Sequence, residues 1–148
     1  MRDRSQLFLT VGAVLNTIIA LFHVIIIFAG PEAYIYFGAG AEMARMDSEG
    51  SIVPDVVTFI LAIGFILFAL YGFSGAGLIR QFPARKPILV IIATIYLLRG
   101  IVGLITDRYF EIASTESELL KDIIFSLTAL VVGLCYAIGA KMRWKILG

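Results

Sequence analysis

Four stretches of about 20 mostly apolar residues dominate this sequence. They run approximately from Leu7 to Phe28, from Val56 to Ile79, from Ile88 to Thr106 and from Ile123 to Ala140. A helix needs about 20 such residues to cross the hydrocarbon core of a bilayer. Because backbone polar groups must be paired internally in lipid, we expect each stretch to form a membrane-spanning helix.

The composition supports this interpretation. The chain has 148 residues, of which 60% are hydrophobic and 16% charged, whereas an average soluble domain is about 45–50% apolar and about 25% charged. A soluble domain of this length buries only about 70% of the surface of its chain. We therefore expect residues 1–148 to form a single four-helix transmembrane domain with the lipid bilayer as its solvent.

The basic residues indicate the orientation of the four spans. Eight of them fall in the two tails and the second loop: Arg2, Arg4, Arg80, Arg85, Lys86, Lys141, Arg143 and Lys145. The first and third loops hold Arg45, Arg108 and Lys121, together with ten of the eleven acidic residues. Since Lys and Arg collect in short cytoplasmic loops, we expect both termini to be cytoplasmic. The prediction is an up-down-up-down, all-α bundle in a bacterial-type inner membrane.

The first external loop, from about Ala29 to Asp55, is the longest connection in the chain. Pro31 suits the first turn of a helix, and apolar residues then recur at helical spacing: Tyr34, Phe37, Ala41 and Ala44. This pattern predicts a short amphipathic helix lying in the outer interface. We expect Glu42 to pair with Arg45 in that loop, one helical turn away.

Each predicted span carries one stripe of small and polar residues among Leu, Ile, Val and Phe. Small residues allow membrane helices to approach closely, and polar residues avoid lipid, so the four stripes should face one another. The stripes comprise Gly12, Asn16, Ala20 and His23; Asp55, Thr58, Ala62, Ala69, Gly72 and Ala76; Tyr96, Arg99, Gly103 and Thr106; and Asp122, Ser126, Ala129, Gly133 and Ala140.

Arg99 is the first candidate for a functional residue, because a charged side chain at mid-helix costs about 2.5–3.5 kcal/mol on insertion scales. A structural role is the alternative, with Arg99 paired to Asp122 or Asp55. His23 lies at a similar depth and is the one candidate acid or base, although a hydrogen-bonded packing role fits a lone histidine better. Together with Tyr96 and Asn16, these residues form a candidate ligand-binding set in a polar cup that opens outward.

Several kinds of site are not expected. The single cysteine, Cys135, cannot form an internal disulfide or a Cys-x-x-Cys pair. One histidine without metal-ligand spacing gives no metal site, and we expect no cofactor. A net charge of +1 offers no basic excess for nucleic acid.

In length and four-span layout, the chain resembles two groups of membrane proteins, the small bacterial DoxX-like proteins and the eicosanoid and glutathione-linked membrane enzymes. The resemblance rests on span count and size. The second group carries several Arg, Asn and Glu residues within its helices, where this chain has only Arg99 and Asn16 at such depth. No residue role follows from the resemblance.

Three functions fit these patterns. The first is a binding or accessory protein that holds an amphiphile with an acidic head group, or a partner helix, in the cup. Arg99 suits the head group because its planar fork donates two parallel hydrogen bonds to a carboxylate or phosphate. The second is a membrane enzyme in which His23 moves protons on a lipid-like substrate. The third is a structural subunit, with a second copy of the chain or a larger membrane complex as partner.

Overall fold

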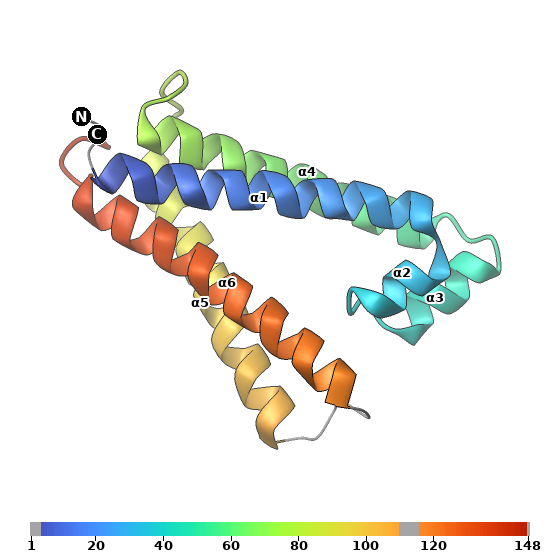
Figure 1. Ribbon diagram of the computed structural model, residues 1–148. Coiled ribbons are helices and arrows are strands. Elements are labelled where there is room, and N and C mark those ends of the chain that lie inside the picture. Colours follow the sequence, from blue (N-terminus) through green and yellow to red (C-terminus); the bar gives the residue numbers. More distant parts are fainter. Residues whose placement is uncertain (1–3, 110–115, 148) are drawn as a thin grey trace. The chain divides into compact units, whose positions relative to one another are not determined.

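The computed structural model describes the backbone of residues 4–109 and 116–147 and the side chains of residues 4–106 and 119–147. These parts of the chain are helical and contain no strand (Figure 1). The elements are α1 (Arg4–Ala29), α2 (Pro31–Tyr36), α3 (Ala41–Ser48), α4 (Val53–Ala76), α5 (Arg85–Tyr109) and α6 (Glu116–Met142).

The four long helices α1, α4, α5 and α6 are each long and apolar enough to cross a membrane, as predicted. In the most apolar 18-residue stretch of each helix, only 28%, 22%, 33% and 44%, respectively, is buried inside the protein. Most of this apolar surface therefore needs another apolar medium. The helix ends differ from the predicted span ends by one to seven residues. The α6 helix begins at Glu116 rather than Ile123, and α4 ends at Ala76 rather than Ile79.

Gly77 explains the earlier end of α4. It has φ 75°, a left-handed conformation that a helix cannot continue. The amide of Leu78 bonds back to the carbonyl of Phe73, which closes the helix terminus. The buried Ser74 hydroxyl then donates to the Arg80 carbonyl and accepts from the Phe82 amide, at 2.9 and 2.8 Å. Ser74 therefore fixes the connection to α5.

The chain divides into two compact units, one of Met1–Leu15 with Ala69–Gly148 and one of Asn16–Phe68. We describe each unit by itself. In the first unit, glycines set the helix contacts. A side-chain carbon on Gly75 would lie 2.8 Å from Leu89 and 3.2 Å from Leu9, and one on Gly139 would lie 2.6 Å from Leu9. A side chain at either position would require the neighbouring leucines to move.

The contact between α5 and α6 follows the same rule. Gly133 on α6 faces Leu97, and a side-chain carbon there would lie 3.0 Å from the Leu97 backbone nitrogen. Gly100 on α5 faces Leu130, whose side chain would lie 2.6 Å from such a carbon. Leu130 does not belong to the small-residue stripe expected on its helix, but it still lies at the α5–α6 contact, because it fills the space left by Gly100.

The predicted stripes are otherwise largely buried. Their buried members include Gly12, Asn16, Ala20, Thr58, Ala62, Ala69, Gly72, Ala76, Tyr96, Gly103, Ser126, Ala129, Gly133 and Ala140. His23, Asp55, Thr106 and Asp122 are half-buried, and Arg99 is exposed. The small residues thus identify the packed faces of the helices. Arg99 is the exception, because it belongs to a predicted stripe but is exposed.

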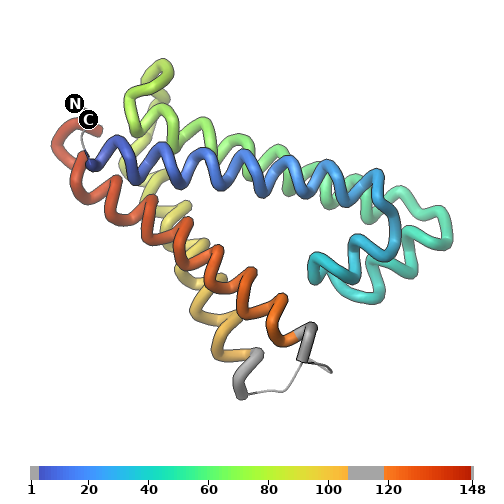
Figure 2. Tube along the Cα trace, viewed as in Figure 1, coloured from blue at the N-terminus to red at the C-terminus, as the bar shows by residue number. Residues whose placement is uncertain are grey.

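In the second unit, the predicted amphipathic helix is two helices, α2 and α3, which lie side by side (Figure 2). Gly38 and Gly40 separate them with φ angles of 81° and 96°, which end one helix and allow the chain to reverse. Pro31 occupies the first turn of α2, as expected. Ile26, Tyr34 and Ala44 form a small buried cluster beneath the two helices.

Candidate functional site

The six candidate residues fall into two groups. Tyr96, Arg99 and Asp122 belong to the first unit, and Asn16, His23 and Asp55 to the second. Asn16 and Tyr96 are buried, at 0% and 6% exposure. The structure therefore supports two separate local arrangements, one around Arg99 and one around Asp55.

Arg99 carries no ion pair to another described side chain. The two ion pairs found among the described residues both belong to Arg45, which binds Glu42 at 2.7 Å and also binds Glu49. The expected pairing of Glu42 with Arg45 is thus confirmed, and it lowers the pKa of the Glu42 carboxyl. The direct Arg99–Asp122 pair is not formed, although both side chains are described.

Gly103 shows where the Arg99 guanidinium lies instead. Gly103 follows Arg99 by one turn of α5, and a side-chain carbon there would lie 2.6 Å from Arg99 Nη1. The same carbon would collide with the Ser126 hydroxyl oxygen of α6. Both polar groups therefore lie against Gly103, in the space that a side chain at this position would occupy. We call Arg99, Gly103 and Ser126 the Gly103 niche.

Ser126 is the unsatisfied member of this niche. The residue is 1% exposed, and its hydroxyl has no hydrogen-bond partner among the described residues. A buried polar group without a partner costs about 1–3 kcal/mol. Asp122 lies one turn before Ser126 on α6 and is half-buried. The Gly103 niche thus offers a cation and a free hydroxyl, the two groups that bind a carboxylate or a phosphate well.

His23 has the surroundings of a packing residue. Its Nδ1 lies 2.8 Å from the Ile19 carbonyl oxygen, so this nitrogen carries the proton and donates. The ring packs against Phe65, with centroids 4.7 Å apart. No described hydrogen bond or ion pair joins the ring to a carboxylate. This geometry favours the packing role over the acid or base role.

Asp55 has a partner that the sequence did not suggest. The buried Tyr34 hydroxyl donates to Asp55 Oδ1 at 3.0 Å and also shares a hydrogen bond with Thr58. Burial raises the pKa of Tyr34, the bond with Thr58 opposes this, and Asp55 raises the pKa again. The sequence predicts Tyr34 only as an apolar residue of the interfacial helix. Because 21 residues separate it from Asp55, no local spacing could have indicated this bond.

Ser126 was expected on the inner stripe, but not as a binding group. The signal available in the sequence was the pair of small residues, Gly103 and Ser126, at similar levels of two neighbouring helices. No cluster of three or more His, Cys, Asp or Glu that could hold a metal occurs among the described residues. The chain matches no family model, no curated protein sequence and no solved structure.

Proposed function

We propose that this protein is an integral membrane protein that binds an amphiphile through an anionic head group at the Gly103 niche. Arg99 provides the charge and the Ser126 hydroxyl a directed hydrogen bond, while the acyl part lies along the apolar helix surface. The observation that carries this proposal is that a guanidinium with no ion pair to a described side chain and a buried hydroxyl with no hydrogen-bond partner among the described residues lie together against Gly103.

The distribution of charge supports an orientation for this site. With both termini cytoplasmic, α5 runs outward, and Arg99 lies seven residues before Thr106, about 10 Å along the helix. The niche then opens in the outer half of an up-down-up-down bundle, with α2 and α3 in the outer interface. An amphiphile of the outer leaflet has its head group near this depth, and an arginine side chain can reach toward it.

Arg99 places a positive charge within the apolar helix α5. An isolated charge within a span is unfavourable, and a structural arginine would be paired with a carboxylate. Neither Asp122 nor any other described side chain forms that pair. An anionic head group would neutralise Arg99 and satisfy Ser126 together. Binding of an anionic head group would therefore stabilise the folded protein.

Ligand-dependent stability tests this proposal. A ligand that binds only the folded state raises its melting temperature by mass action. We expect decanoate or a short-chain phosphatidic acid to raise the melting temperature of the purified protein in nonionic detergent by several degrees. A phosphocholine amphiphile of equal chain length should not. The two anionic probes distinguish a carboxylate from a phosphate.

Two pairs of variants locate the effect. Arg99→Met should abolish the stabilisation, whereas Arg80→Met, which removes an exposed loop arginine, should retain it. Gly103→Ala should weaken it, because the added methyl group displaces Arg99 and Ser126. Gly64→Ala is the matched control, since its new methyl group meets no atom within 4 Å. Equal responses of Arg99→Met and the unmodified protein would reject the site and favour a structural role for Arg99.

A further inference from the structure

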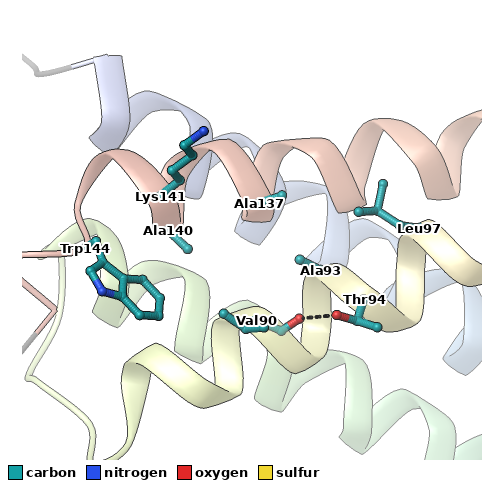
Figure 3. Close-up of a pocket in the computed structure, with 8 residues that line it drawn as sticks. All are labelled: Val90, Ala93, Thr94, Leu97, Ala137, Ala140, Lys141 and Trp144. Atoms are coloured by element: carbon teal, nitrogen blue, oxygen red, sulfur yellow. Dashed lines mark hydrogen bonds between the residues drawn. The ribbon is translucent and has the colours of Figure 1, made fainter.

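A second feature of the first unit lies at the opposite end of α5 and α6 from the Gly103 niche. A groove of about 370 Å³ runs between the early part of α5 and the late part of α6 (Figure 3). Its walls are mainly apolar and small, and it is lined by Val90, Ala93, Thr94, Leu97, Ala137, Ala140, Lys141 and Trp144. This volume falls in the range of small-molecule sites, about 300–1,000 Å³.

One end of the groove is both aromatic and cationic. Trp144 follows α6, and its ring stands at this end in Figure 3. Lys86, from the first turn of α5, places its Nζ 5.4 Å from the centre of that ring. Lys141 contributes its stem to the wall, and its ammonium extends away from α5 in the same view. The exposed, flexible side chain of Lys141 can move this ammonium to a head group beside Trp144.

This arrangement matches an anionic phospholipid. Tryptophan prefers the boundary between hydrocarbon and head groups, and basic pockets between spans recognise anionic head groups. Small residues at Ala93, Ala137 and Ala140 leave room for an acyl chain. The side chain of Thr94 adds little polarity, because its hydroxyl donates to the Val90 carbonyl at 2.9 Å.

We infer that the α5–α6 groove binds one anionic phospholipid, with its acyl chain between the helices and its phosphate beside Lys141 and Lys86. This site is separate from the Gly103 niche and does not depend on the function proposed there. The lipid belongs to the leaflet at the C-terminal end of α6. It would fill the groove between these helices and hold Trp144 at the membrane boundary.

Trp144 is the single tryptophan of the chain and is 48% exposed, so its fluorescence reports on this groove alone. In phosphatidylcholine vesicles, brominated phosphatidylglycerol should quench Trp144 more strongly than an equal fraction of brominated phosphatidylcholine. Lys141→Gln should reduce this preference roughly fivefold, equivalent to about 1 kcal/mol per basic residue near an anionic surface. Lys145→Gln, outside the groove, should leave the preference nearly intact.

A second pair of variants separates the groove from the general charge of this face. Ala137→Phe fills the groove and should remove the preference, while Ile138→Phe, on the adjacent exposed position, should not. Circular dichroism and gel filtration confirm that both variants fold. Equal quenching by the two lipids, or equal losses in Lys141→Gln and Lys145→Gln, would overturn the inference. Quenching by neither lipid, together with a cross-linked dimer, would assign the groove to a second copy of the chain.

Discussion

Two buried serines show how different roles arise from one residue type. Ser74 is 0% exposed and makes two hydrogen bonds that fix the loop after α4. Ser126 is 1% exposed and makes none. A bonded buried hydroxyl contributes to stability, whereas an unbonded one reduces it. The two serines are therefore expected to contribute to folding stability with opposite signs.

We expect Ser126→Ala to raise the free energy of unfolding by about 1 kcal/mol in the absence of ligand, because it removes an unsatisfied hydroxyl. Ser74→Ala should lower it by a similar amount. Thermal unfolding of the two variants in one detergent measures both effects. With decanoate or short-chain phosphatidic acid present, Ser126→Ala should gain less stability than the unmodified protein. A loss of stability in Ser126→Ala without ligand would show that its hydroxyl has a partner.

Tyr34 gives a prediction that depends on pH. Tyr34→Phe removes the bond to Asp55 and should destabilise the second unit by about 1–2 kcal/mol near neutral pH. The pKa of Tyr34 is raised above its usual value of 10 in the folded state. Its stabilising effect is therefore complete below pH 10 and is lost as the pH rises through the folded-state value.

The difference in stability between the unmodified protein and Tyr34→Phe should accordingly shrink above pH 10. Unfolding followed by circular dichroism from pH 7 to about 11 covers this window. Asp55→Asn provides the control for the charge of the acceptor, because it keeps an acceptor oxygen and removes the negative charge. A difference that stays constant through the alkaline range would show that ionisation of Tyr34 is not coupled to folding.

At the scale of the helices, glycine and leucine act as pairs. Gly133 admits Leu97, and Gly100 admits Leu130, so the α5–α6 contact depends on both members of each pair. The position of a leucine relative to the small-residue stripe of its helix is therefore a poor guide to how much the leucine stabilises the α5–α6 contact. What matters is whether the facing helix provides a gap at the same level.

Gly133→Leu should force α5 and α6 apart and prevent formation of a stable first unit. Leu130→Ala should also be destabilising, by about 2–3 kcal/mol, since it leaves a cavity above Gly100. Leu134→Ala is the matched control, because Leu134 is 49% exposed on the same helix. Melting temperatures in detergent should rank Leu134→Ala above Leu130→Ala, and Gly133→Leu lowest. A Leu130→Ala variant as stable as Leu134→Ala would contradict the pairing.

At the scale of the whole molecule, the charge distribution predicts which side of the membrane each loop faces. Ser48 lies in the acidic first loop and Ala84 in the basic second loop. In a Cys135→Ala background, Ser48→Cys should react in intact cells with a membrane-impermeant thiol reagent, and Ala84→Cys should not. The native Cys135 is buried, and its removal ensures that only the introduced cysteine can react with the reagent. Ser114 was expected to label from outside as well, but it lies beyond the described residues.

Labelling of position 84 in intact cells would reverse the predicted orientation. Permeabilised cells supply the control, since both cysteines should then react. The basic residues of the tails and the second loop outnumber those of the other loops by eight to three, a bias that normally fixes the orientation of short loops. An inverted result would also move the Gly103 niche to the cytoplasmic half of the membrane.

The sequence by itself determined the four long apolar helices and most of their packed faces. Both follow from local rules, because the length of an apolar run and the spacing of small residues are properties of one segment at a time. Tertiary structure decided the rest. The Tyr34–Asp55 bond and the Leu130–Gly100 contact join segments with no common period. The same holds for the Gly103 niche. There Arg99, which was expected to contact Asp122 or Asp55, lies near the Ser126 hydroxyl, because Gly103 carries no side chain that would keep these groups apart.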